Sequence, residues 1–234
     1  MTHRIRAYLS VPRLLLTLSA LLVAGCATVY EGKLDSTLFL RSPASLDTKV
    51  NAQIAVVADV ALTQFKYERE KRGQPKLVIP VGQVVEAAAC AAMSDVFGRS
   101  VVQYSSPEAA IEANRSTPQL TLVAPRPVKF ELHDESVPFL LPIPYMFLMP
   151  ISTRQDVRLI VDWQVLGSDG RLLWTKRYDS GDVTLPFKRT DDRDSKLEYY
   201  FVHLTHEAAY TLMHQAAQDV RKWIEAERLR ERIL

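Results

Sequence analysis

The chain has 234 residues, enough for one compact domain with a sizeable core, and 47% of them are hydrophobic. Its formal net charge of +2 depends on the first 25 residues, which contain three arginines and no acid; without them, 26 Lys and Arg face 27 Asp and Glu, a net charge of −1. This balance excludes the net positive field that nucleic-acid-binding proteins usually have, so no nucleic-acid partner is expected.

The N-terminus combines a positive start, a short apolar run and a cysteine. Arg4, Arg6 and Arg13 belong to the positive start, and residues 14–23 form an apolar run too short to span a bilayer as a helix. The run ends in Leu-Val-Ala-Gly-Cys, whose last residue is Cys26. This order resembles the signal of bacterial lipoproteins. The alternative is an ordinary secretory signal that ends by chance in Ala-Gly-Cys.

The resemblance implies processing, an anchor and a location. In that family, diacylglycerol is attached to the cysteine thiol, and cleavage before the cysteine leaves it as the acylated mature N-terminus, here Cys26. Two or more acyl chains hold a protein firmly on a membrane. Ala27 is not the Asp that retains enterobacterial lipoproteins in the inner membrane, so the resemblance implies the periplasmic leaflet of the outer membrane. We expect a signal peptide at residues 1–25, a tether at 26–48 and a single periplasmic domain at 49–234.

Only one other cysteine is present, Cys90, so acylation of Cys26 leaves no intrachain disulfide. Cys90 lies in an alanine-rich stretch without a neighbouring cation. We interpret it as a small buried apolar residue and expect no redox role.

The first half of the domain predicts a strand, a loop or hairpin tip, a short apolar piece and a helix. Residues 50–60 are rich in Ile and Val and predict a strand, residues 66–74 a loop or hairpin tip, and residues 77–79 a short apolar piece that Pro80 ends. A helix is expected at residues 83–97, opened by Gly82 and ended by Gly98. Its apolar stripe is Val85, Ala89, Ala92, Met93 and Val96.

A brief helix and a proline-containing strand follow a short strand at residues 101–104. Ser106, Pro107 and Glu108 give this helix a cap, a first-turn proline and an early acid. Residues 119–132 predict its partner strand. Because Pro125 and Pro127 cannot donate to a ladder, we expect an edge strand or a bend there.

The second half predicts a hairpin and a long helix. Residues 154–166 predict the clearest strand in the chain, with Val157, Leu159, Val161, Trp163 and Val165 on one face and Arg158, Asp162 and Gln164 on the other. A turn at residues 167–170 leads into a second alternating strand, Leu172 to Tyr178. After a charged loop at 188–196, a helix is expected at residues 197–230. Its packed stripe is Ala209, Met213, Ala216, Val220 and Trp223. The order of elements predicts an α+β domain, a mostly antiparallel sheet with two main helices packed on one face.

Residues 137–151 contain no charge and four prolines. The prolines and the short length exclude a membrane-spanning helix. One interpretation is an irregular buried segment that fills an open end of the core; the other is an exposed contact surface for a partner, a ligand or the membrane. The residues expected to bind a partner are Phe139, Leu140, Tyr145, Met146, Phe147 and Met149.

Catalytic signatures are weak. The sequence contains no Gly-x-Ser-x-Gly elbow and, with eight glycines, no Gly-rich phosphate loop. His203, His206, Glu207 and His214 lie on the last helix, but Tyr210 stands where a zinc-protease helix needs its second histidine, so partly exposed helix-face histidines are expected instead. The acids Asp191, Asp192 and Asp194 lack the glycine and distal glutamate of a calcium loop. We expect no enzyme, no cofactor and no metal.

The signal and the element order together resemble small periplasm-facing lipoproteins that assist export machines. Examples are the LPS-assembly lipoprotein, auxiliary lipoproteins of ABC-type lipid transporters and lipoproteins with a domain like the N-terminal domain of the Tol-Pal component. The resemblance implies a membrane-anchored, non-enzymatic accessory lipoprotein that binds a protein partner in the envelope. The alternatives are a carrier or gate for lipid or another apolar ligand, and a metal-dependent hydrolase that uses the histidine helix.

Overall fold

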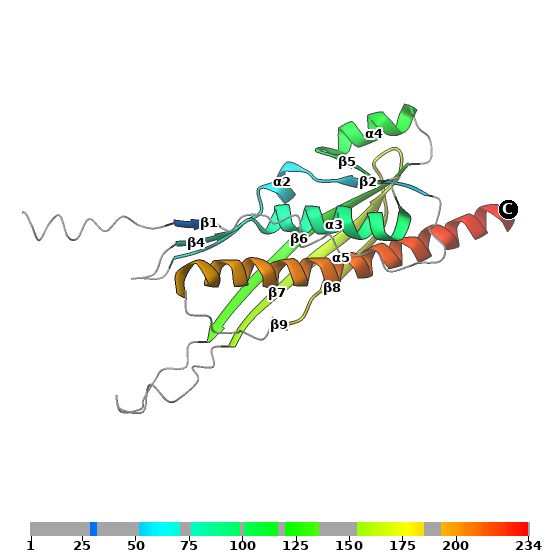
Figure 1. Ribbon diagram of the computed structural model, residues 1–234. Coiled ribbons are helices and arrows are strands. Elements are labelled where there is room, and N and C mark those ends of the chain that lie inside the picture. Colours follow the sequence, from blue (N-terminus) through cyan, green and yellow to red (C-terminus); the bar gives the residue numbers. More distant parts are fainter. Residues whose placement is uncertain are drawn as a thin grey trace, which may run out of the picture.

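The computed structural model shows an elongated α+β domain (Figure 1). It describes residues 29–31, 52–70, 76–98, 101–116, 120–135, 154–184 and 193–233. The elements are β1 (Val29–Glu31), β2 (Gln53–Val57), α2 (Val60–Thr63), β3 (Tyr67–Arg69), β4 (Lys76–Ile79), α3 (Val81–Phe97), β5 (Val101–Tyr104), α4 (Pro107–Ser116), β6 (Leu120–Glu135), β7 (Arg154–Leu166), β8 (Leu172–Asp179), β9 (Val183–Thr184) and α5 (Arg193–Ile233).

The larger sheet has the strand order β5-β2-β6-β7-β8, with β9 paired to β7. The predicted α+β class is confirmed, but the sheet is mixed. β2 pairs in parallel with both β5 and β6, whereas β6, β7, β8 and β9 pair antiparallel. Parallel strands can be joined only by a crossover connection. Here α3 lies in the connection from β2 to β5, and α4 lies in the connection from β5 to β6.

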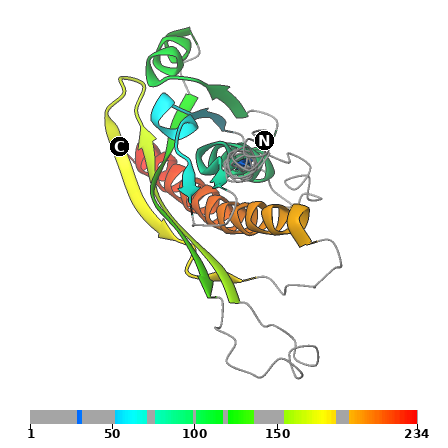
Figure 2. The ribbon, with the colours of Figure 1, turned by 90° about the vertical axis from the view of Figure 1, so that its left-hand side faces the viewer.

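Both main helices, α3 and α5, pack on one face of this sheet, as the sequence predicts, and they contact each other (Figure 2). The predicted α3 stripe is fully buried, and Gly98 ends the helix with a positive φ of 83°. Trp163, with no exposed surface, lies in the same core. On α5 four stripe residues are buried and Trp223 is half-buried.

The brief helix α4 packs on the opposite face. Its Ala110 joins a second, small cluster with Ala55, Val57, Leu122 and Ala124. The predicted cap is confirmed: the Ser106 Oγ accepts a hydrogen bond from the Ala109 N–H at 3.1 Å. The step from β2 to β5 runs in the opposite direction to the step from β5 to β6, and right-handed crossovers of opposite direction place their helices on opposite faces.

The prolines of β6 have a specific place in the sheet. β6 is not an edge strand, because it lies between β2 and β7. However, β2 pairs only with residues 120–123, so Pro125 and Pro127 lie beyond its end. The register also shifts between Pro127 and Lys129, so the predicted bend is present.

A small sheet of order β1-β4-β3 lies at one end of the domain. β3 and β4 form an antiparallel pair. The prediction of a loop or hairpin tip at residues 66–74 is therefore wrong at Tyr67–Arg69, which form β3. β1 pairs in parallel with β4, Val29 opposite Lys76. Three residues of the expected tether therefore belong to a sheet. They pair with the edge of β4 that β3 does not occupy.

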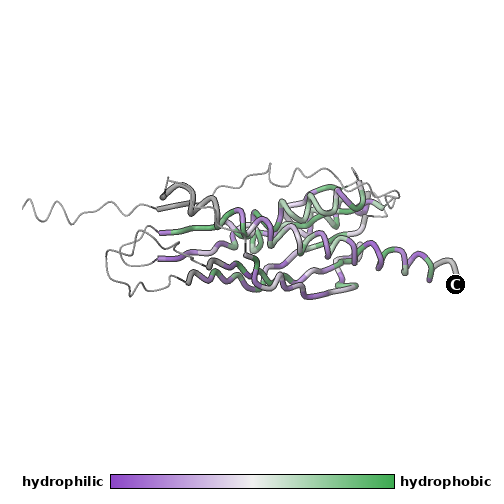
Figure 3. Tube along the Cα trace, turned by 60° about the horizontal axis from the view of Figure 1, so that its bottom comes forward, coloured by the Kyte–Doolittle hydropathy of each residue, from purple (hydrophilic) through white to green (hydrophobic). Residues whose placement is uncertain are grey.

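The last helix, α5, begins at Arg193, before its expected start, and extends to Ile233. Ile224 is its last buried residue, and the turns beyond it project from the body and carry mostly hydrophilic residues (Figure 3). Within the described part of the chain, no helix is long and apolar enough to cross a membrane.

Candidate functional site

The predicted anchor and the predicted contact residues fall outside the described part of the chain. These residues are Cys26, Phe139, Leu140, Tyr145, Met146, Phe147 and Met149. Their flanks are described: β1 begins at Val29, β6 ends at Glu135 and β7 begins at Arg154.

The ladder between β6 and β7 changes in character toward the last described pair, Glu135 with Arg154. Leu132 pairs with Val157, and Val157 is fully buried. Beyond this apolar pair come His133 with Asp156, Asp134 with Gln155 and Glu135 with Arg154, all polar or charged. Asp156 is still buried, and its Oδ1 accepts a hydrogen bond from the Thr184 Oγ1 of β9 at 2.5 Å. The hairpin therefore changes from apolar to polar before the described residues end.

The flanks of both predicted sites lie at the same end of the molecule. β1, the small sheet, the start of α5 and the tips of β6 and β7 are at the left in Figure 1, while the end of α5 is at the right. Two contacts join these parts: the rings of Tyr67 and Phe130 are 5.2 Å apart, and the Arg69 guanidinium lies 5.5 Å from the centre of the Phe201 ring. The small sheet is thus fixed to both β6 and α5.

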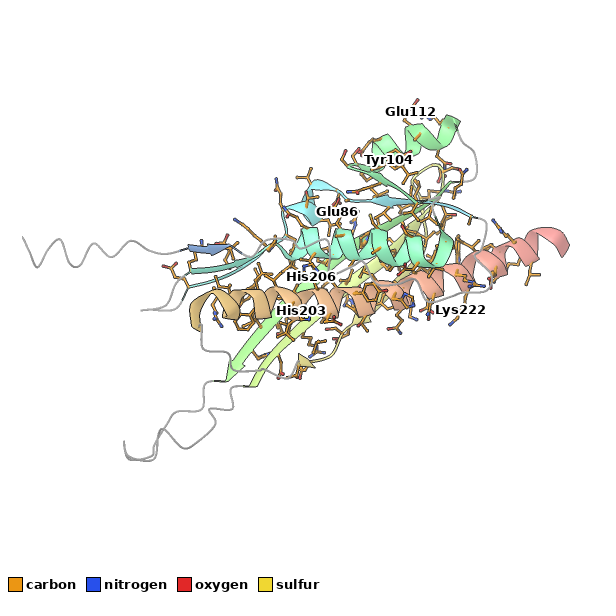
Figure 4. All side chains as sticks on the ribbon, viewed as in Figure 1. Glu86, Tyr104, Glu112, His203, His206 and Lys222 are labelled. Carbon is orange, nitrogen blue, oxygen red and sulfur yellow. The ribbon has the colours of Figure 1, made fainter. Side chains whose placement is uncertain are left out.

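The histidines of α5 differ in burial. His203 and His214 are half-buried, as expected, but His206 is only 2% exposed, so the expectation of partial exposure is wrong there. His206 continues the buried stripe of Val202, Ala209 and Met213, spaced by three and four residues, which explains its burial. His203 and His206 lie on the first half of the helix, far from Lys222 (Figure 4). Among the described residues, no group of three or more His, Cys, Asp or Glu is placed to hold a metal ion.

Cys90 is half-buried on α3. Burial, and secondarily the charge of Glu86, raises the pKa of its thiol to about 11. A thiol with such a pKa is almost entirely protonated at neutral pH and is a poor nucleophile. Its surroundings therefore fit the structural role that the sequence predicts.

The described residues also form a groove of about 720 Å³ that the sequence did not reveal. It lies between α4, the β7–β8 turn and α5. Its apolar part is lined by Ile111, Leu166, Leu173 and Trp223, and its polar part includes Asn114, Arg115 and Asp169. The turn and α4 approach closely: a Cβ on Gly170, whose φ is 80°, would lie 2.8 Å from the Ile111 Cδ1.

The two charges that line the groove have partners of their own. Arg115 pairs with Glu112 at 2.7 Å and Asp169 with Arg171 at 2.6 Å, and the hydrogen bonds from Arg171 lower the pKa of Asp169. The groove therefore suits an apolar or neutral occupant better than an ion. One sequence signal was available: Leu172 and Leu173 are adjacent in an alternating strand, so one of them must leave the core face.

Comparisons with known proteins give distant structural likenesses. No protein-family model matches the chain, and no curated protein matches it in sequence. A DUF330-family protein from Xanthomonas campestris is 14% identical and aligns over 85% of this chain and 99% of its own, with a TM-score of 0.47. A Helicobacter pylori protein, named as a homologue of a neuraminyllactose-binding hemagglutinin, is 9% identical over 84% of this chain and 98% of its own, with a TM-score of 0.48. A minor lipoprotein from Acinetobacter baumannii is 9% identical over 73% of this chain and 96% of its own, with a TM-score of 0.37.

Proposed function

We propose that this chain is a lipid-anchored, non-enzymatic accessory protein of the bacterial envelope. In this proposal Cys26 is acylated and holds the domain on the periplasmic face of the outer membrane. The domain binds a protein of an export or assembly machine through residues 137–151. The Leu-Val-Ala-Gly-Cys signal supports the anchor, and the uncharged composition of residues 137–151 supports a contact surface.

The β6–β7 ladder is the observation that carries the partner proposal. A segment that filled the end of the core would be expected to continue the apolar ladder. Instead, the three pairs after Leu132 and Val157 are polar or charged, from His133 with Asp156 to Glu135 with Arg154. An apolar segment beyond such a polar tip is more easily explained by a partner than by the core of its own domain. The prolines lower the entropy lost when such a segment docks.

Membrane fractionation of cells that produce the Cys26→Ser variant tests the anchor. A serine has no thiol to acylate, so the variant should accumulate as an unprocessed precursor or leave the outer-membrane fraction. Cys90→Ala is the matched control, and it should fractionate like the natural protein. Normal outer-membrane retention of Cys26→Ser would contradict the lipoprotein proposal.

The groove supports a second candidate function, the carrier of a lipid or another apolar ligand. Its volume of about 720 Å³ lies in the range of small-molecule pockets, and its lining joins apolar side chains to a few polar groups. Native mass spectrometry of the domain without its anchor should then detect a bound lipid. Leu173→Asp should abolish that binding, whereas Leu172→Asp should not, because both leucines are 52% exposed but only Leu173 lines the groove.

A further inference from the structure

The described fold begins almost immediately after the candidate anchor. Only Ala27 and Thr28 separate Cys26 from the first residue of β1, Val29. Three residue steps span at most about 11 Å when fully extended. A free tether of the length expected from the sequence, residues 27–48, would instead have an end-to-end distance of about 25 Å. The short connection holds the beginning of β1 close to any lipid attached at Cys26.

The beginning of β1 has a fixed position in the domain. β1 runs parallel to β4, and β4 leads through Pro80 directly into α3. β3, the other neighbour of β4, contacts β6 through Tyr67 and α5 through Arg69. The anchor is therefore attached at one defined end of the long axis, the left-hand end of Figure 1.

The small sheet and its flanks contain three basic and three acidic residues: Lys66, Arg69 and Lys76, and Glu31, Glu68 and Glu70. The Glu68 carboxylate pairs with the Lys66 Nζ and with the Lys76 Nζ, both at 2.6 Å. These two hydrogen bonds lower the pKa of Glu68 to about 2, so it remains ionised at neutral pH and pairs with both lysines. Lys76 lies directly opposite Val29 in the ladder. The surface beside Val29 is therefore charged and balanced, which suits contact with hydrated lipid headgroups better than burial among acyl chains.

We propose that the small sheet β1-β4-β3 is a surface that faces the lipid headgroups of the bilayer, held there by the two-residue connection between Cys26 and Val29. This inference rests on the proposed acylation of Cys26. It also orients the rest of the domain: Ala226 is 25 residues after Phe201 on α5, about 40 Å along the helix, so the projecting end of α5 is free to extend away from the membrane.

Headgroup quenching tests the proposal with the acylated full-length protein. In a Cys90→Ala background, Glu70→Cys places a fluorophore at the exposed end of the small sheet, and Ala226→Cys places it on the exposed end of α5. Acylated Cys26 offers no free thiol to the dye. The proteins are reconstituted in phosphatidylethanolamine–phosphatidylglycerol vesicles that contain lipids with a nitroxide on the headgroup. We expect strong quenching at position 70 and little at position 226.

Two further variants make the result specific. A flexible Gly/Ser linker of about 20 residues between Thr28 and Val29 should keep the protein on the vesicles but reduce quenching at position 70. The same linker after Gly181 should leave the quenching unchanged.

The outcomes separate this proposal from the anchor on which it rests. Equal quenching at both positions, or stronger quenching at position 226, in protein that floats with the vesicles would overturn the bilayer-facing surface and leave the anchor intact. Protein that fails to float would contradict acylation at Cys26, and the orientation would fall with it.

Discussion

The two faces of β7 belong to different parts of the molecule. On the inner face, Val157, Leu159, Val161, Trp163 and Val165 have no exposed surface and pack under α3 and α5. On the outer face, guanidinium–carboxylate pairs join β7 to β8: Arg158 with Asp179 and Asp162 with Arg177. The buried residues that stabilise the fold therefore lie on the inner face of β7, whereas its outer face carries partly exposed ion pairs.

Trp163→Ala should have the largest effect on stability. Removal of a fully buried indole leaves a cavity and should lower the free energy of unfolding by about 3–5 kcal/mol. Trp163→Phe should cost clearly less, because it keeps an aromatic ring and because the buried Nε1 makes no hydrogen bond to the described residues. Denaturant unfolding measures both. Equal losses for the two variants would show that the packing of an aromatic ring at this position contributes little to stability.

Gly82→Ala tests the close approach of the first turn of α3 to α2. A Cβ on Gly82 would lie 1.6 Å from the Leu62 carbonyl oxygen, which belongs to α2 and is backbone. The backbone must move, so we expect a loss of about 1–3 kcal/mol or more. Gln83→Ala, on the exposed side of the same helix turn, should be nearly neutral. Thermal unfolding that ranks the two variants equally would contradict the close approach of α2 and α3.

Arg158→Ala should have the smallest effect, at most about 1 kcal/mol, because the Arg158–Asp179 pair is partly exposed. The Arg158 hydrogen bonds lower the pKa of Asp179 to about 2, below its usual value of about 3.9. A lowered carboxyl pKa stabilises the fold above about pH 4, and the contribution is lost as the pH falls through 2. The stability difference between natural protein and variant should therefore shrink over this range, and the Asp179 pKa, followed by NMR titration, should rise in the variant.

The sequence predicts the core of this fold well because periodicity determines it. The bounds of β7, the stripe of α3 and the cap of α4 are confirmed, since each depends on residues close in sequence. The parallel pairing of β2 with β5 and β6 was missed, because direction follows from where the crossovers pack and not from the composition of a strand. The same holds for β1: Val29–Glu31 is too short to show a period, and only the free edge of β4 explains its pairing.

The candidate sites also differ in whether local sequence is enough to predict them. The apolar character of residues 137–151 is a local property and is visible in the sequence, whereas the groove is built from α4, β6, β7, β8 and α5 and has no local signal apart from Leu172 and Leu173. The burial of His206 was accessible from its spacing to Val202 and Ala209. The three polar pairs at the described end of β6 and β7 became visible only with the register.

The triple substitution Phe139→Ser, Tyr145→Ser and Phe147→Ser tests the central claim most directly. If residues 137–151 are a contact surface beyond the polar hairpin tip, the acylated variant should keep the melting temperature of the natural protein, because exposed side chains contribute little to the stability of the free domain. It should lose the envelope protein that the natural protein captures from detergent-solubilised membranes, because aromatic anchors carry most of an interface's energy. Leu172→Ser, an exposed apolar residue on β8, is the control and should keep both properties. A triple variant that fails to fold would contradict the claim, because three buried aromatic rings at about 3–5 kcal/mol each would exceed the stability of an ordinary domain.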